Sequence, residues 1–165
     1  SLGHGITCNA DLVTEEEVWR VMLELSQDLG HRLRVHHLAA SGVQLSVKSN
    51  DLKTRQFQRP LPVITQSPFE IASCARSLFA EYDWRRDVRA VSVRVIGLVP
   101  EGKPFQTDLF TDLSRFDKQK SIDDTVDALR NRFGKKIVTA ASLMGDIKVP
   151  SHSDRESILP GMMHK

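Results

Sequence analysis

The chain is poor in cysteine and in aromatic residues and has no long apolar run, and each shortage excludes a class of protein. No stretch approaches the roughly 20 apolar residues of a membrane-spanning helix. Aromatic residues make up 6% and hydrophobic residues 40% of 165 residues, a globular composition that excludes wholesale disorder and suits one domain with an appendage. No charged segment followed by an apolar core opens the chain, so we expect no secretory signal. Because residue 1 is Ser rather than Met, we expect a processed chain or a fragment of a longer one.

The two cysteines, Cys8 and Cys74, stand far apart. They form neither a CxxC pair nor a Cys/His cluster, which argues against a zinc site. The spacing leaves a disulfide open, but we expect two buried free thiols in a reducing cytoplasm.

Motifs for catalysis are also absent. The sequence contains no GxGxxG, GxxxxGK[ST], HExxH or GxSxG. Asp123 and Asp124 are adjacent, so on a helix their side chains diverge and suit a cap rather than a metal pair. His36 and His37 read as ordinary surface histidines on a basic connector. We therefore predict no catalytic residue and no metal ligand in this chain.

Charge is segregated along the chain although the formal net charge is only +2. Residues 1–30 hold six acids against one base, and residues 31–60 hold six bases against one acid. The bases of this second stretch are Arg32, Arg34, Lys48, Lys53, Arg55 and Arg59. A basic sector on a near-neutral chain indicates an anionic partner, most often nucleic acid, while charge alone leaves an ordinary solvated surface equally open.

The first half of the chain shows clear periodicity. Residues 3–8 predict a short strand, and Thr14 with Glu17 predicts a capping box that begins a helix ending near residue 34. Apolar residues alternate with polar ones over residues 41–49, which predicts a half-buried strand. A turn and a returning strand over residues 54–59, ended by prolines, complete a hairpin.

A second helix and a last strand follow. Ser67 and Glu70 predict another capping box, with Pro68 at the first helical position. Alternating valines predict a strand over residues 88–98. The order β-α-β-β-α-β predicts an α+β fold for residues 1–99, a four-stranded antiparallel sheet with both helices on one face.

The rest of the chain reads as an appendage. Residues 100–120 predict a linker, and Ser121 with Asp124 predicts the start of a helix over residues 121–132 within a C-terminal helical segment, 121–143. The apolar stripe expected on this helix is Ile122, Val126, Leu129 and Phe133. Residues 144–165 have no periodic pattern and are predicted to be a disordered tail.

The open face of the predicted sheet carries the candidate binding site. It lacks aromatic residues, so contact with backbone phosphates fits better than base stacking. The face is expected to present Gln44, Ser46, Lys48, Ser92 and Arg94, with side chains from residues 55–59. The predicted phosphate contacts are Lys48, Lys53, Arg55, Arg59 and Arg94, with Gln56 and Gln58 adding neutral hydrogen bonds.

A second candidate site is the peptide Gln106-Thr107-Asp108-Leu109-Phe110, beyond the sheet. Exposed Leu109 and Phe110 would fit an apolar pocket on a partner, with Gln106 hydrogen-bonding at its rim. Chemistry alone favours the alternative that both apolar side chains pack within the chain.

These residues carry a resemblance. Four segments are similar to the C-terminal region of bacterial Y-family lesion-bypass DNA polymerases, of the DNA polymerase IV and UV-damage-repair type. They are the opening Ser-Leu-Gly-His-Gly-Ile-Thr, Asp11-Leu12 before the acidic helix start, residues 43–47 with Asp51, and residues 54–59 running into Pro60. That region is called the little finger, or polymerase-associated domain. Residues 106–110 match the QxxLF pattern by which such polymerases bind the bacterial sliding clamp. The resemblance covers residues 1–110 and extends more weakly over residues 130–142.

The resemblance implies a non-catalytic fragment of a DNA repair polymerase of the SOS response. The family's catalytic carboxylates lie in an upstream palm domain, so no cofactor is expected here and Mg²⁺ is expected in the missing domain. The implied partners are duplex template-primer DNA, gripped by its phosphates, and the beta subunit sliding clamp, bound through Gln106, Leu109 and Phe110. A cytoplasmic monomer without membrane contact is implied. The alternative from the residues is a stand-alone ferredoxin-like protein-interaction module without DNA binding; a small enzyme of this fold would need a cleft with convergent polar groups.

Overall fold

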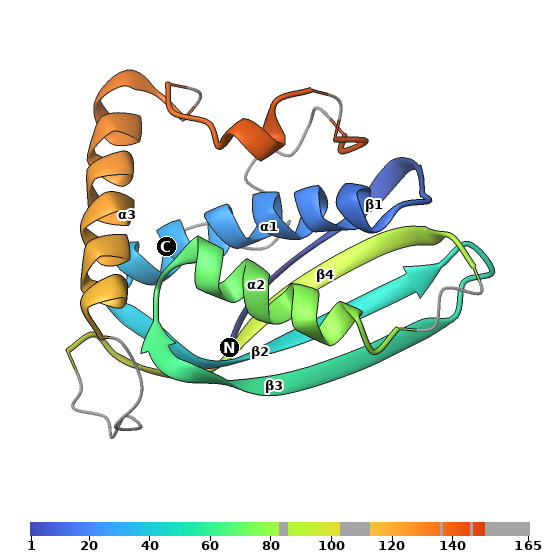
Figure 1. Ribbon diagram of the computed structural model, residues 1–165, viewed down its shortest axis with the longest axis horizontal. Helices are drawn as coiled ribbons and strands as arrows, with labels where there is room; N and C mark the ends of the chain where they lie inside the picture. The colour runs from blue at the N-terminus through green and yellow to red at the C-terminus, as the bar shows by residue number, and fades with distance from the viewer. Residues whose placement is uncertain (83–85, 103–112, 136, 146, 151–165) are drawn as a thin grey trace, which may run out of the picture.

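A four-stranded antiparallel sheet is the centre of the fold, in the order β1-β4-β2-β3. The computed structural model describes residues 1–82, 86–102, 113–135, 137–145 and 147–150. Helices α1 and α2 cover one face of the sheet, and α3 stands at one end of it (Figure 1). The predicted order β-α-β-β-α-β and the α+β fold are confirmed. The elements are β1 Leu2–Leu12, α1 Glu15–Val35, β2 Leu38–Ser49, β3 Thr54–Thr65, α2 Pro68–Phe79, β4 Val88–Pro100, α3 Leu113–Phe133 and the 3₁₀ turn η1 Ala141–Leu143.

Helix α1 begins at the predicted capping box. The Thr14 hydroxyl accepts the Glu17 backbone N–H at 3.2 Å, and the Glu17 carboxylate accepts the Thr14 backbone N–H at 3.3 Å. These bonds satisfy donors that a helix start leaves unpaired. From this fixed start, the apolar stripe Val18, Met22, Leu25, Leu29 and Leu33 is wholly buried against the sheet and α2.

The second predicted cap is wrong. Ser67 precedes Pro68 as expected, but its side chain makes no capping hydrogen bond. Helix α1 packs closely against the start of α2. A Cβ on Gly30 of α1 would lie 2.7 Å from Pro68 Cγ and 2.8 Å from the Gln66 carbonyl oxygen. Glycine at position 30 therefore lets α1 approach the beginning of α2.

Strand β3 runs beyond the prolines that were expected to end it. It continues through Pro60 and Pro62 to Thr65, and among the described residues it pairs with β2 alone, so it forms an edge of the sheet. An edge strand has one side without ladder bonds, and a proline that lacks its N–H is tolerated there. A register shift between Ala40 and Gly42 of β2 accommodates this stretch.

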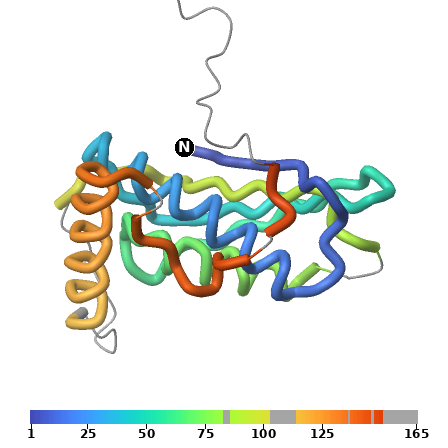
Figure 2. The backbone as a smooth tube through the Cα atoms, turned by 90° about the horizontal axis from the view of Figure 1, so that it is seen from above, coloured from blue at the N-terminus to red at the C-terminus, as the bar shows by residue number. Residues whose placement is uncertain are grey.

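The C-terminal part is more ordered than expected. Helix α3 begins at Leu113, inside the predicted linker, so Ser121 lies within the helix rather than at its cap. Leu143 of η1 packs against Leu23 and Ala72. Residues 147–150, which were expected in a disordered tail, reach β1, where the Asn9 N–H donates to the Lys148 carbonyl at 3.0 Å (Figure 2).

Both cysteines are free and half-buried. Burial raises the pKa of the Cys8 thiol to about 11 and also raises the pKa of Cys74. Both thiols are therefore protonated at neutral pH, and the expectation of free thiols is confirmed.

Candidate nucleic-acid interface

Strand register decides which side chains share the open face of the sheet. In β2, Val43, Leu45 and Val47 point into the core and are wholly buried. Because side chains alternate along a strand, the residues between them face the other side. Across the sheet these are Gln44 with Gln58 and Arg94, Ser46 with Gln56 and Ser92, and Lys48 with Thr54 and Ala90. The structure therefore brings together four of the predicted contacts, Lys48, Gln56, Gln58 and Arg94.

The face so defined is basic, and its other side chains are small. Lys48 and Arg94 are its cations, and the paired positions 3–7, 44–48, 54–58 and 90–94 contribute no carboxylate to it. No aromatic ring lies at these positions on this side, since Phe57 packs against the core. This surface offers charge and hydrogen bonds to phosphates and offers no ring on which a base could stack.

Two glycines of β1 shape this face, and the sequence reading missed them. Gly5 pairs with Ser92, and a Cβ on Gly5 would lie 2.7 Å from the Ser92 Cβ. Gly3 pairs with Arg94, and a Cβ there would lie 3.4 Å from Arg94 Nε, so the arginine side chain lies across Gly3. The Gly3-x-Gly5 spacing of two, which places both glycines on one strand face, is the signal that could have identified them.

Arg55 and Arg59, two of the predicted contacts, lie on the edge strand β3 but not on the open face. Their register partners are Val47 and Val43, so both side chains stand on the side of the sheet that carries the helices. Arg59 is engaged there by α2: its guanidinium lies 2.6 Å from a Glu81 carboxylate oxygen and donates to the Ser77 hydroxyl at 3.1 Å. The sequence left the phase of β3 ambiguous, and the register with β2 resolves it.

Lys53 lies at the tip of the β2–β3 hairpin. Its ammonium is 3.4 Å from Asp51, and the Ser49 hydroxyl donates to the same carboxylate. The Ser49 hydrogen bond and Lys53 hold the pKa of Asp51 below its ordinary value. Lys53 is 81% exposed and can turn from Asp51 to an anion at the tip.

The second predicted site lies outside the described residues. Gln106, Leu109 and Phe110 fall within residues 103–112, between β4 and α3. Strand β4 ends where Pro100 pairs with Leu38, the first residue of β2, whereas the hairpin tip follows Ser49, the last residue of β2. The strand that precedes this peptide in the sequence therefore ends at the end of the sheet opposite to the hairpin tip that carries Lys53.

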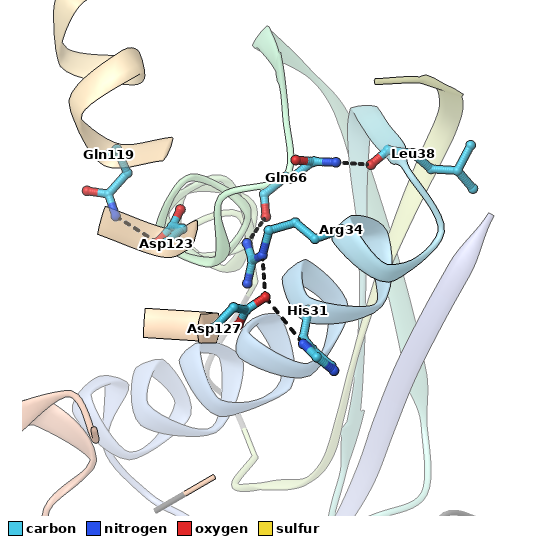
Figure 3. A network of polar contacts seen from close by, with 7 residues as sticks. All are labelled: His31, Arg34, Leu38, Gln66, Gln119, Asp123 and Asp127. Carbon is cyan, nitrogen blue, oxygen red and sulfur yellow. Dashed lines mark hydrogen bonds and ion pairs between the residues drawn. The ribbon is translucent and has the colours of Figure 1, made fainter. Parts of the chain in front are cut away.

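Helix α3 is attached to the domain by polar contacts. The Arg34 guanidinium donates to Asp127 at 2.6 Å and to the Gln66 carbonyl at 3.2 Å, and His31 Nδ1 lies 3.3 Å from Asp127 (Figure 3). Burial tends to raise the pKa of Asp127, but Arg34 and His31 outweigh burial and hold this pKa below its ordinary value. Burial dominates at Asp123 and raises its pKa. Asp127 is thus the charged anchor of α3.

A cavity of about 380 Å³ lies between α1, α3 and the segment around η1. Its polar lining is largely occupied by internal contacts: His4 lies 3.1 Å from Asp28, and Arg130 donates to the Gln27 side chain at 2.7 Å. The His4 hydrogen bond holds the pKa of Asp28 below its ordinary value. The described residues contain no group of His, Cys, Asp and Glu side chains that could hold a metal ion. In the same part of the chain, no helix is both long and apolar enough to cross a bilayer.

The sequence is similar to a known domain family and to known proteins. The model of the impB/mucB/samB family C-terminal domain matches residues 1–109. The chain is 36% identical over 147 residues to DNA polymerase IV of Acetivibrio thermocellus, a match that covers 88% of this chain and 37% of the relative. DNA polymerase IV of Moorella thermoacetica is 34% identical over 148 residues, with 88% and 36% covered. The chain thus spans about a third of the length of these curated relatives.

Solved structures share the fold. A complex of beta-clamp processivity factor and the little finger domain of PolIV matches with a TM-score of 0.50 and 21% identity, over 66% of this chain and 97% of that one. A post-insertion binary complex of Dbh DNA polymerase matches with a TM-score of 0.52 and 14% identity, over 60% of this chain and 29% of that one. At these identities the likeness concerns the fold alone.

Proposed function

Since the chain belongs to the impB/mucB/samB family and carries its C-terminal domain, the little finger of Y-family DNA polymerases, we propose that it grips duplex DNA by its phosphates and tethers a lesion-bypass polymerase to the sliding clamp. The observation that supports the DNA half best is the open face, where Lys48 and Arg94 stand among small and neutral side chains without a carboxylate.

The chemistry of this face suits a polymerase that moves past damaged bases. Phosphate contacts hold a duplex in register but carry no direct sequence information, so a lesion does not remove them. Gly3, Gly5 and Ser92 keep the surface low, which lets a phosphate backbone approach Arg94 and Lys48. Gln56 and Gln58 add neutral hydrogen-bond donors along β3.

The clamp half of the proposal rests on Gln106, Leu109 and Phe110. Their sequence fits the clamp-binding pattern, and the domain family covers residues 1–109. One protein of similar fold is described as a little finger domain in complex with a beta-clamp. A clamp tether raises the effective concentration of the polymerase at the primer terminus without adding DNA contacts.

In this proposal the chain does not polymerise DNA. The chain spans about a third of relatives named DNA polymerase IV, and we assign the catalytic carboxylates and their Mg²⁺ to the part of the protein outside it. The isolated chain should extend no primer in the presence of Mg²⁺ and nucleotides. Extension above a no-protein control would overturn this assignment.

The experiment that tests the DNA half is a salt titration of duplex binding. With Arg59 engaged by Glu81, the remaining candidate cations are Lys48 and Arg94 on the open face, Lys53 at the hairpin tip and Arg55 on the edge strand. Two to four neutralised phosphates predict a log-log salt slope of about −2 to −4. Binding that does not change with salt, or no binding above background, would reject phosphate gripping and favour a protein-interaction module.

A further inference from the structure

Helix α3 exposes most of its apolar stripe. Ile122, Val126, Leu129 and Phe133 follow one another at spacings of four, three and four residues, which places them on one side of a helix. Ile122 is 48%, Leu129 38% and Phe133 58% exposed. Val126 is half-buried. The four residues are here called the α3 stripe, and three of them are exposed.

Charge explains this orientation. The side of α3 that meets the domain carries Asp123, Asp127 and Arg130. Asp127 satisfies Arg34, whose side chain is only 13% exposed, and turning the stripe inward would leave this guanidinium without its anion. Removing one partner of a buried ion pair is strongly unfavourable, so the ion pair determines the rotation of the helix.

Polar contacts attach the α3 stripe's helix to the domain along its length. Contacts to the domain are distributed along the helix, from Arg115 with Glu70 at 2.7 Å, through Lys120 with Glu101 at 2.8 Å, to Arg130 with Gln27 at 2.7 Å. A partner that binds the stripe therefore meets a surface that is already ordered, which lowers the entropic cost of association.

We propose that the α3 stripe is a second contact surface for the sliding clamp, beside the peptide Gln106–Phe110; this inference rests on the proposed function. The argument for this occupant is covalent distance. Phe110 precedes Leu113, the first residue of α3, by three residues, so a clamp-bound Phe110 holds the helix start within ~10 Å. Ile122 lies about 14 Å further along the helix and Phe133 at its far end, about 30 Å from its start.

Helix α3 does not cover the open face of the sheet. Helix α3 contacts α1 through Arg34 and α2 through Glu70, and both helices lie on the side of the sheet opposite to Lys48 and Arg94. One chain can therefore hold the clamp through the peptide and the stripe while its open face holds a duplex. An apolar surface of this kind fits an apolar patch on a protein and has no favourable contact with phosphates.

The test measures binding of the full chain to purified bacterial sliding clamp. The stripe variant carries Ile122→Ser, Leu129→Ser and Phe133→Ser. Its matched control carries Asp117→Ser, Asp124→Ser and Ala128→Ser, exposed positions on another side of α3. The peptide variant carries Leu109→Ala and Phe110→Ala. Hydrogen exchange of α3 in each variant without clamp checks that the helix is still docked.

We expect the stripe variant to weaken clamp binding roughly tenfold, the control to leave it unchanged and the peptide variant to abolish it. With wild-type clamp bound, amides of residues 122–133 should gain protection from exchange. Unchanged affinity of the stripe variant, while the peptide variant fails to bind, would overturn the second contact and leave the tether standing. Equal binding by wild type and peptide variant, or no binding by wild type, would reject the tether and this inference together. A change in oligomeric state with clamp affinity unchanged would assign the stripe to a second copy and overturn the proposal.

Discussion

Arg34 Nε of α1 and Asp127 Oδ2 of α3 lie 2.6 Å apart, and both side chains are only 13% exposed. This ion pair joins two helices that are far apart in the sequence. It lies in a polar network that includes His31 and the Gln66 carbonyl, so Arg34 also connects α3 to the start of α2. The rotation of α3, and with it the exposure of its stripe, follows from this contact.

Replacing Asp127 by Asn should loosen α3 and leave the sheet domain folded. The substitution removes the anion beside a largely buried guanidinium, which we expect to cost about 1–3 kcal/mol of docking free energy. Hydrogen exchange should become faster over residues 113–133, with little change in β2 and β4. Asp124→Asn, an exposed neighbour on the same helix, is the control. Unchanged protection of α3 in Asp127→Asn would show that the pair does not hold the helix.

The docking of α3 should also weaken in acid. The pKa of Asp127 is lower in the folded protein than its ordinary value of about 3.9, so the carboxylate stabilises docking above that value. The stabilisation is lost as the pH falls from there through the folded pKa. Amide chemical shifts of α3, followed by NMR from about pH 6 to about pH 2, should report the loss of docking as Asp127 is protonated. An α3 whose shifts do not change until the whole domain unfolds would contradict this assignment.

Duplex affinity should depend on Lys48 and Arg94 and be insensitive to Arg59. The double substitution Lys48→Ala with Arg94→Ala removes both cations of the open face and should reduce the salt slope by about 2. Arg59→Ala is the matched control, because Arg59 lies on the helix side in contact with Glu81. Fluorescence anisotropy of a labelled duplex at several salt concentrations measures both. Equal losses in the two variants would mean that the open face is not the binding surface.

Gly5→Ala should destabilise the sheet through a single side-chain clash. The new Cβ would lie 2.7 Å from the Ser92 Cβ, and we expect a loss of about 1–3 kcal/mol in the free energy of unfolding. Ser92→Gly in the same chain removes the clashing atoms and should recover part of that loss. Urea denaturation of both single variants and the double variant measures the coupling. Additive effects would show that the two residues do not compete for this space.

Thr14→Ala should cost about 1 kcal/mol of stability, because it removes the side-chain half of the capping box at α1. Ser67→Ala is the comparison, since Ser67 occupies the equivalent position before α2 but makes no capping bond. We expect it to cost only ~0.3 kcal/mol. Thermal unfolding of the two variants separates them. A larger loss for Ser67→Ala would show that α2 depends on its cap after all.

Much of the fold could be read from periodicity. The alternation through Val43, Leu45 and Val47 and the three- and four-residue spacing from Val18 to Leu33 are local patterns, and each element needs one buried face. Thr14 and Glu17 marked a helix start because a capping box is made by residues three apart. These features depend on neighbours in the chain, so the sequence by itself determined the element types and their order.

Tertiary structure decided the features that depend on distant partners. Arg55 and Arg59 face the helices because β2 sets the register of β3, and a shift of one residue would turn both to the open face. Pro60 and Pro62 remain inside β3 because β3 is an edge strand of the sheet that the described residues form. Helix α3 leaves Ile122, Leu129 and Phe133 exposed because Asp127 contacts Arg34 and His31, residues 93 and 96 positions away. Sequence periodicity predicts that a helix has an apolar and a polar side. Which side packs against the domain depends on the charged residues that distant elements place beside the helix.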